Sequence, residues 1–199
     1  FKDVIVLGTG GSSKAGRTFV QIAYRTFGRN PKFPKITFLE NIDFQDFNDL
    51  FKKINLKKTG VIVISKSGET NETLVQFLIF LSKYKKSFQK KKIQKHFTII
   101  TKKDSSTLRN LANDFSIDIV DLDSNLSGRF SAFSPVGLLP AAISGLNIKK
   151  ITEGALFLLK KTLKKEQKIP SEGAALHYSA QNSKINISVL LTYTERLRN

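Results

Sequence analysis

The stretch VIVISKSGETNETL, residues 61–74, contains a strand, a polar loop and the start of a helix in direct succession. Its β-branched beginning predicts a buried strand over residues 60–65. A helical pattern over residues 70–86 follows, and its apolar stripe at i, i+3, i+4 and i+7 consists of Leu74, Phe77, Leu78 and Leu81. A strand followed at once by an amphipathic helix is the repeating unit of a parallel sheet.

The same alternation runs through the first 120 residues. Short β-branched runs predict five strands, at residues 3–8, 35–39, 60–65, 96–101 and 117–120. Helical segments are predicted between them, near residues 15–27, 43–54, 70–86 and 105–114. Strands that are apolar on both faces and alternate with helices predict an α/β fold, with a three-layer α/β/α, doubly wound, five-stranded parallel sheet.

Ligands of doubly wound sheets bind at the carboxyl ends of the strands, near the point where the strand order reverses. Right-handed crossovers bring all those ends to one edge. The loops to search are therefore those at residues 8–14, 40–42, 65–70 and 102–105.

Beyond residue 121 the alternation stops, and a polar loop leads to a short apolar helix. Ser134 and Pro135 suit the N-cap and the first turn of that helix. Pro140 lies inside it and should either kink it or shorten it.

The remainder of the chain predicts two helices, near residues 149–165 and 172–182, and an apolar strand over residues 186–193. Only TERLRN follows that strand. We therefore expect a first domain with trailing helices over residues 1–185, and the first strand of a truncated second domain over residues 186–199.

The composition limits the class of protein. A chain of 199 residues, 40% of them hydrophobic, is long enough to bury a core. No apolar stretch approaches the roughly 18–20 residues that span a bilayer, so we expect no membrane partner. The absence of cysteine excludes disulfides and thiolate metal sites and favours a cytoplasmic protein. Since the chain begins with Phe1 and contains no methionine, we expect a fragment.

The net charge of +17 raises nucleic acid as a partner. Lysines outnumber arginines, however, and they gather in three runs, at residues 52–58, 83–95 and 160–168. No helix-turn-helix, zinc-finger or aromatic-sheet motif accompanies these lysines. We therefore expect no nucleic-acid partner but a hydrated basic surface that attracts anionic substrates, and binding to DNA that survives physiological salt would contradict this.

The stretch IVLGTGGSSKAGRTF, residues 5–19, allows two nucleotide-binding interpretations, and both are incomplete. A dinucleotide loop needs glycine where Ser13 stands, and its acidic candidate, Glu40, lies 27 residues further on rather than about 20. A Walker loop needs lysine where Arg17 stands. What remains is a glycine-rich turn that leads through Ser12 into a helix N-terminus, which can approach an anion or serve only as a tight turn.

The loop at 65–70 gathers polar groups at one helix start, three hydroxyls and one ammonium. These groups belong to Ser65, Lys66, Ser67 and Thr70. They suit a phosphomonoester, to which the helix N-terminus adds roughly 0.3–1 kcal/mol. Glu69 and Glu72 would repel a phosphate, so they should point sideways or cap the helix. A helix start capped by Ser or Thr, without a ligand, is the alternative.

Three motifs, which follow one another along the chain in the order that the family has, resemble the sugar isomerase (SIS) family, and in particular its phosphoglucose isomerase branch. SKSGETNET at 65–73 is similar to the family's phosphate loop, and LGTGGSS at 7–13 is similar to its G-x-G-G-S turn. SGRFSAFSPVGLLP at 127–140 is similar to its G-G-R-[FY]-S-x-x-S-x-V-G-L signature, and the tail VLLTYTERL resembles its PYSDRL stretch. Ser127 for the first glycine of that signature and Thr192 for the usual proline are departures.

The resemblance implies a SIS domain of flavodoxin-like topology and the interconversion of glucose 6-phosphate and fructose 6-phosphate through an enediol. It implies a sugar 6-phosphate substrate, no cofactor, no metal, and a homodimer for the full-length protein. Ser65, Lys66, Ser67 and Thr70 would hold the phosphate, Gly11 and Ser12 would line the sugar, and Arg129 would be the catalytic residue beside the enediolate.

The family also uses groups that this sequence lacks. Its general base is a glutamate in a Q-L-x-x-E-S-x-G-K motif, and a histidine opens the sugar ring, but neither motif occurs here. Glu195 precedes the place of the base, and His96 and His177 stand in contexts typical of structural residues. We therefore expect a segment that binds the phosphate without useful turnover. A non-catalytic sugar-phosphate sensor is the alternative.

Overall fold

The computed structural model describes residues 1–24, 28–166, 168–189 and 191. Contacts divide the chain into two compact units, Phe1–Leu146 and Asn147–Arg198. Across the described residues, no helix combines the length and the apolar character that crossing a membrane requires.

The first unit is built on a sheet of five parallel strands. The strands are β1 (Asp3–Leu7), β2 (Lys35–Leu39), β3 (Thr59–Ile64), β4 (Phe97–Lys102) and β5 (Asp118–Leu122). Their order in the sheet is β2-β1-β3-β4-β5. Leu7 pairs with both Leu39 of β2 and Val63 of β3, so β2, β1 and β3 end within one residue of one another. Each predicted strand of this sheet is confirmed.

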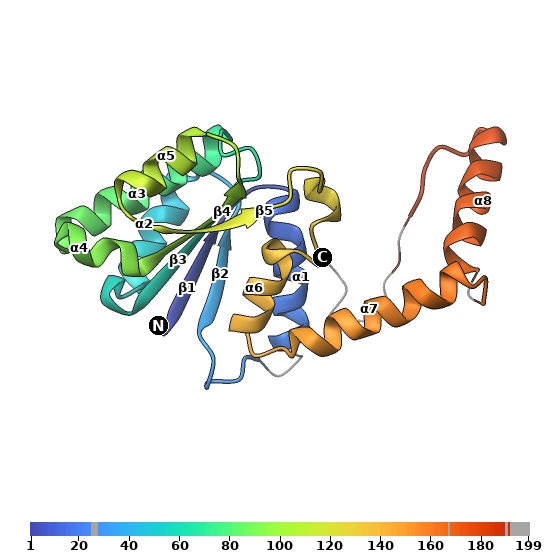
Figure 1. Ribbon diagram of the computed structural model, residues 1–199, viewed down its shortest axis with the longest axis horizontal. Coiled ribbons are helices and arrows are strands. Elements are labelled where there is room, and N and C mark those ends of the chain that lie inside the picture. Colours follow the sequence, from blue (N-terminus) through green and yellow to red (C-terminus); the bar gives the residue numbers. More distant parts are fainter. Residues whose placement is uncertain (25–27, 167, 190, 192–199) are drawn as a thin grey trace. The chain divides into compact units, whose positions relative to one another are not determined.

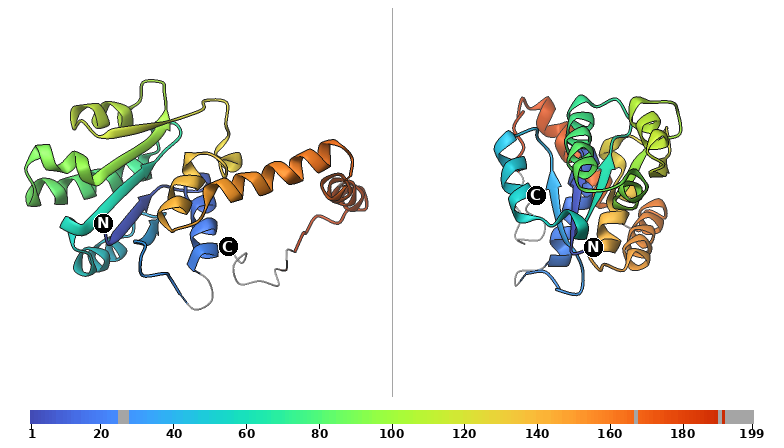
Figure 2. Two further views of the ribbon diagram at one scale, coloured as in Figure 1. Left: turned by 60° about the horizontal axis from the view of Figure 1, so that its bottom comes forward. Right: turned by 90° about the vertical axis from the view of Figure 1, so that its left-hand side faces the viewer.

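Helices cover both faces of this sheet (Figures 1 and 2). One face carries α1 (Gly11–Tyr24) and α6 (Pro135–Ile143). The other carries α2 (Phe44–Lys53), α3 (Asn71–Ser87), α4 (Lys90–Ile93) and α5 (Thr107–Asp114). Short 3-10 turns lie at Leu56–Lys58, Gln94–His96 and Gly128–Phe130.

Successive side chains of a strand point to opposite faces, and this alternation fills two separate cores. In β1, Ile5 packs into the core under α2, α3 and α5, whereas Val6 packs into the core under α1 and α6. Both side chains are fully buried. The predicted three-layer α/β/α arrangement is therefore confirmed.

Two helices differ from the prediction. α1 begins at Gly11 rather than near residue 15, because the N–H groups of Ser12 and Ser13 already bond to the carbonyls of Thr9 and Gly10. α4 lies within the lysine-rich run at 83–95, where we expected a connection. Its Ile93 is 1% exposed and anchors this short helix in the core. The helix was not predicted because lysines surround this single apolar residue.

The start of α6 follows the prediction. Ser134 is the N-cap, its hydroxyl accepts a hydrogen bond from the N–H of Val136 at 3.2 Å, and Pro135 is the first helical residue. Pro140 is buried within the helix, which ends three residues later at Ile143. Pro140 therefore lies inside the helix, as predicted, and the helix is short, with nine residues.

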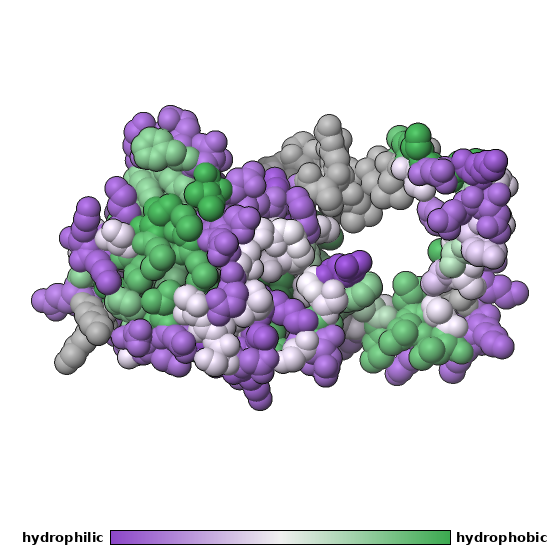
Figure 3. Space-filling view, turned by 90° about the horizontal axis from the view of Figure 1, so that it is seen from above, coloured by the Kyte–Doolittle hydropathy of each residue, from purple (hydrophilic) through white to green (hydrophobic). Residues whose placement is uncertain are grey.

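The second unit contains α7 (Ile148–Leu163) and α8 (Ile169–Asn182), and both were predicted. Neither helix buries a residue, and large apolar side chains such as Phe157 and Leu163 are more than half exposed. Figure 3 shows hydrophobic residues, in green, at the surface of one face of the molecule. Residues 186–189 and 191 form no strand, and the rest of the predicted strand lies outside the described residues. The domain boundary at 185/186 stays a prediction.

Candidate functional site

The carboxyl ends of β1 and β3 lie next to each other in the middle of the sheet, and the chain leaves them in opposite directions. β1 continues into α1 on one face, and β3 continues into α3 on the other (Figure 1). In a sheet of this order, ligands bind where the connections diverge. Two of the predicted loops, 8–14 and 65–70, meet at this point.

The loop after β3 holds its three hydroxyls in one connected cluster. Ser65 is 1% exposed, and its Oγ accepts a hydrogen bond from the N–H of Gly68 at 3.1 Å. The same Oγ lies 3.0 Å from Thr70 Oγ1, which in turn lies 3.4 Å from Ser67 Oγ. Ser67 Oγ also accepts from the N–H of Glu69 at 3.1 Å. Ser65 thus faces inward, while Ser67 is exposed and Thr70 is half-buried.

The same loop leaves a helix end and a cation available. Thr70 is the N-cap of α3, but its side chain makes no capping hydrogen bond. This finding weighs against the alternative of a simple capped helix start. Lys66 is half-buried, and its ammonium forms no ion pair with any residue that the structure describes. A free ammonium and a free helix N-terminus both favour an anion.

Glu69 turns away from the hydroxyl cluster, as predicted. Its carboxylate accepts hydrogen bonds from the N–H of Thr107 at 2.6 Å and from Thr107 Oγ1 at 2.8 Å. It therefore caps α5 and not α3, on which Glu72 stays exposed. The bond from the Thr107 backbone, followed by that from its side chain, lowers the pKa of Glu69 below its ordinary value.

The loop after β1 touches the segment that contains Arg129. A Cβ atom at Gly11 would lie 2.6 Å from the backbone carbon and oxygen of Gly128, so only glycine allows this approach. Ser131 links the two segments, since its hydroxyl lies 3.4 Å from the carbonyl oxygen of Gly11 and donates to the carbonyl of Gly128 at 2.6 Å. The motif LGTGGSS at 7–13 therefore lies against the motif SGRFSAFSPVGLLP at 127–140.

Other polar groups of the first loop are occupied within the protein. Ser13 Oγ donates to Glu40 Oε1 at 2.6 Å, and Lys14 Nζ lies 3.2 Å from Glu40 Oε2. Arg17 lies 3.5 Å from the same carboxylate. Burial raises the pKa of Glu40, but these hydrogen bonds and charges outweigh it and lower the pKa overall. The helix over residues 11–18 leaves no loop for a Walker sequence. The acidic candidate of the dinucleotide interpretation, Glu40, is already bound to Ser13, Lys14 and Arg17.

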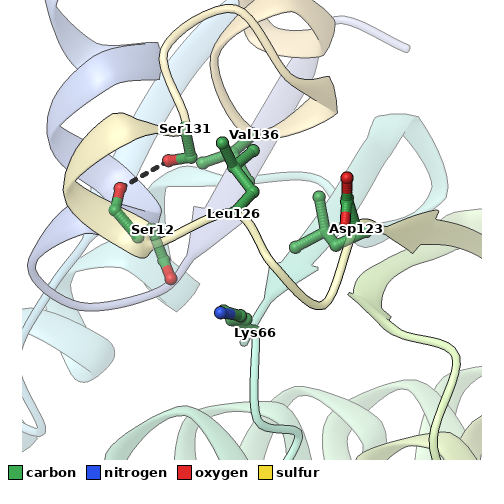
Figure 4. Close-up of a pocket in the computed structure, with 8 residues that line it drawn as sticks. Ser12, Lys66, Asp123, Leu126, Ser131 and Val136 are labelled. Carbon is green, nitrogen blue, oxygen red and sulfur yellow. Dashed lines mark hydrogen bonds between the residues drawn. The ribbon is translucent and has the colours of Figure 1, made fainter.

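A small pocket, with a cavity volume of about 10 Å³, lies where the three motifs converge (Figure 4). Of the predicted residues, Ser12 and Lys66 line it. The remaining lining residues were not predicted, and they are Leu122, Asp123, Leu126, Gly128, Ser131 and Val136. The pocket therefore depends on the segment after β5 more than the sequence suggested.

Arg129 and Asp123 are the charged groups of that segment. Arg129 lies on the 3-10 turn Gly128–Phe130, is exposed, and forms no ion pair within the described part of the chain. It does not line the pocket, and neither do Gly11, Ser65, Ser67 and Thr70. Asp123 does, one residue after β5, and its carboxylate accepts from the N–H of Asn125 at 2.9 Å. Its place directly after a strand is the signal that could have revealed it.

The two histidines lie outside this site. His96 Nδ1 is 2.9 Å from the carbonyl oxygen of Thr59, at the amino end of β3, and its ring packs against Phe1 and Tyr84. The structural interpretation of His96 is confirmed. His177 is exposed on α8 in the second unit, and its role stays a prediction. Within the described ranges, no three His, Asp or Glu side chains are grouped to hold a metal ion.

A flavodoxin-like sheet with a Ser- and Lys-bearing loop at its switch point defines a SIS-type α/β domain. The family described as phosphoglucose isomerase matches residues 1–199, and the chain belongs to this family.

Two curated relatives align with the entire chain. It is 33% identical to the glucose-6-phosphate isomerase of Carboxydothermus hydrogenoformans and 32% identical to the probable glucose-6-phosphate isomerase of Methanococcus maripaludis. The alignments cover 44% and 45% of those proteins. The chain thus spans less than half the length of these relatives.

Two solved structures are similar to this chain. A hypothetical protein from Thermus thermophilus superimposes with a TM-score of 0.72 at 27% identity, over 81% of this chain and 37% of that one. A glucose-6-phosphate isomerase from Chlamydia trachomatis gives 0.60 at 26% identity, over 75% of this chain and 27% of that one.

Proposed function

We propose that this chain is the phosphate-binding part of an aldose–ketose isomerase that interconverts glucose 6-phosphate and fructose 6-phosphate. The match to the phosphoglucose isomerase family over residues 1–199 is the observation that carries the proposal. The convergence of the three family motifs at the switch point supports it.

The phosphate is proposed to bind at the N-terminus of α3. Ser67 and Thr70 offer hydroxyls there, and Lys66 supplies an ammonium that no acidic side chain of the described residues neutralises. Hydrogen bonds to a charged group contribute about 1.5–3 kcal/mol each. Ser65, whose hydroxyl is buried, contributes by holding Gly68 and Thr70 in place.

The sugar is proposed to extend from the phosphate toward Gly11, Ser12 and Arg129. Isomerisation moves a proton between adjacent carbons and places negative charge on the enediolate oxygens. A fixed guanidinium beside those oxygens lowers the barrier, by analogy with an oxyanion-hole donor worth about 2.7–4 kcal/mol. Arg129 suits this role because its charge is free within the described residues.

The general base is proposed to come from residues that this chain does not contain, since the family's base motif does not occur in it. A base typically contributes about 10²–10⁴-fold to the rate. The chain should therefore bind glucose 6-phosphate and isomerise it at least about 10²-fold more slowly than a complete enzyme does.

Calorimetric titration of the chain with glucose 6-phosphate, beside glucose and inorganic phosphate, tests the binding. A coupled assay for fructose 6-phosphate, with a full-length glucose-6-phosphate isomerase as the positive control, tests the turnover. Saturable binding of the sugar phosphate with little turnover supports the proposal. Comparable rates would point to a carboxylate within the chain, and Asp123 would be the first to replace because it lines the pocket.

A sugar-phosphate sensor is the second candidate, and the missing base motif favours it. The two differ in their affinity for a mimic of the enediolate, such as a sugar-phosphate hydroxamate. An isomerase site binds the mimic more tightly than glucose 6-phosphate, because it is complementary to the transition state. A sensor gains nothing from the mimic, and equal affinities would favour it.

The homodimer and the cytoplasmic location are proposed for the full-length protein on the family resemblance and the absence of cysteine. Sedimentation velocity of that protein and fractionation of its cells test the two statements.

A further inference from the structure

The proposed phosphate loop is fastened to the start of α5 at three points. The carboxylate of Glu69 accepts both hydrogen bonds that Thr107 offers, from its N–H and from its hydroxyl. The carbonyl of Gly68 accepts from the N–H of Leu108 at 3.0 Å. Gly68 has a φ of +71°, and a Cβ atom there would lie 2.6 Å from Ser106 Cβ. The loop and the first turn of α5 thus form one packed assembly.

The side chain of Glu69 presents an electrostatic problem at a phosphate site. It lies between Ser67 and Thr70 in the sequence, where a carboxylate facing the ligand would repel a phosphate dianion. Its two bonds to Thr107 instead hold the charge at the N-terminus of α5, where a negative charge is favourable. The same bonds keep the group ionised to lower pH than an ordinary glutamate, because they lower its pKa.

We call the two hydrogen bonds between the Glu69 carboxylate and Thr107 the clip. The backbone of Glu69 links the clip to the hydroxyl cluster of Ser65, Ser67 and Thr70. Its N–H donates to Ser67 Oγ at 3.1 Å, and Ser67 Oγ lies 3.4 Å from Thr70 Oγ1. A shift of residue 69 would therefore move the hydroxyl of Ser67 and change its distance to Thr70. Glu69 therefore couples the position of its own side chain at α5 to the geometry of the Ser67 and Thr70 hydroxyls.

We propose that Glu69 is a positioning residue of the phosphate site: by bonding to Thr107, it holds the loop in the form that presents Ser67 and Thr70. It also keeps its own charge away from the phosphate. This inference rests on the proposed function, in which the loop binds the substrate phosphate. It assigns Glu69 no contact with the substrate.

The decisive variant is Glu69→Ala, because simple electrostatics and positioning predict opposite results. Removing a negative charge near a dianion should tighten binding if repulsion alone matters. If the clip holds the loop, Glu69→Ala should weaken the affinity for glucose 6-phosphate about 10-fold, as expected when a charged hydrogen-bonded group is lost. The measurement is calorimetric titration of the full chain, with the melting temperature recorded for each variant.

Three further variants complete the test. Glu69→Gln still accepts the N–H of Thr107 and should restore most of the affinity. Glu72→Ala removes the same charge from an exposed position of α3 and should not weaken binding. Ala112→Gly, in the buried interior of α5, should lower the melting temperature without changing the affinity more than about two-fold. If Glu69→Ala does not fold, Thr107→Val, which removes only the hydroxyl bond, should weaken binding about three-fold.

The outcomes separate the two proposals. Wild-type chain that binds glucose 6-phosphate, together with a folded Glu69→Ala that binds equally well or more tightly, overturns the positioning role alone. Loss of affinity in Ala112→Gly equal to that in Glu69→Ala also overturns it, because any destabilisation of α5 would then suffice. Wild-type chain that does not bind the sugar phosphate overturns the proposed function, and the positioning role with it.

Discussion

The loops after β1 and β3 have similar sequences, but they differ in whether their lysine is paired with a carboxylate of the protein. Both are rich in glycine and serine, both carry a lysine, and both lead directly into a helix. After the first loop, in the opening turn of α1, Ser13 and Lys14 are bound to Glu40. In the second, Lys66 is unpaired within the described residues, and the acidic neighbour Glu69 is bound elsewhere. The ammonium of Lys66 is thus available to an anionic ligand, whereas that of Lys14 is already paired.

The largest expected difference between the loops concerns their glycines. Gly68→Ala should cost well over the roughly 1–2 kcal/mol of a left-handed alanine, because its Cβ would overlap Ser106. Gly10→Ala has a φ of +55° but no atom within 4 Å of the new Cβ, so it should cost only that strain. Urea unfolding of both variants checks this order. Equal losses would show that the packing against α5 does not constrain the second loop.

Loss of the Ser67 and Thr70 hydroxyls should weaken binding, whereas loss of the Ser13 hydroxyl should weaken only stability. Ser67→Ala with Thr70→Ala should weaken the binding of glucose 6-phosphate by about 3 kcal/mol or more, on the order of 10²-fold, with the fold intact. Ser13→Ala in the first loop should leave the affinity unchanged and lower the stability, because its partner is Glu40. Titration calorimetry and thermal melts distinguish the two. Unchanged affinity in a folded double variant would move the phosphate to another place.

Lys66 and Lys14 should also differ in whether their loss weakens binding or stability, and the effect should be smaller than that of the hydroxyls. Lys66→Ala should weaken phosphate binding by about 1.5–3 kcal/mol without destabilising the chain, because its ammonium has no ion-pair partner to lose among the described residues. Lys14→Ala should leave the affinity unchanged and reduce stability by less than about 1 kcal/mol, since the Lys14 side chain of the bridge to Glu40 is 61% exposed. Affinity measured against salt concentration should lose part of its slope only in the first variant.

The smallest expected effect is a pH dependence of stability from Glu40. Its pKa in the folded chain lies below the ordinary value of about 4.5, so its contribution is fully present above that pH. The contribution is lost as the pH falls through the folded pKa, because the protonated group can no longer pair with Lys14 and Arg17. Glu40→Gln should flatten the stability curve below pH 4.5 by less than about 1 kcal/mol. An unchanged slope in this variant would mean that the cluster adds nothing to stability.

The sheet was predictable because its signal is local. Buried parallel strands need β-branched runs that are apolar on both faces, and each of the five carries such a run. The start of α1 was missed because glycine and serine have low helix propensity, although the N–H groups there bond as in a helix.

The site was predictable only in part, because its remaining features depend on contacts between distant residues. The bond of Glu69 to Thr107 joins residues 38 positions apart, and the sequence indicated only that Glu69 should turn aside. The pocket depends on the approach of Gly11 to Gly128, which no spacing rule predicts. Asp123 and Ser131 lie in irregular backbone, where no periodicity marks which side chains face inward.

Every residue predicted for the site belongs to the compact unit Phe1–Leu146, which has its own buried core. In genetic terms, the residues proposed to bind the phosphate and Arg129 lie in one block of the sequence. A recombination event anywhere after Leu146 would transmit them together, and the sequence beyond that joint could diverge or be exchanged without dividing the site.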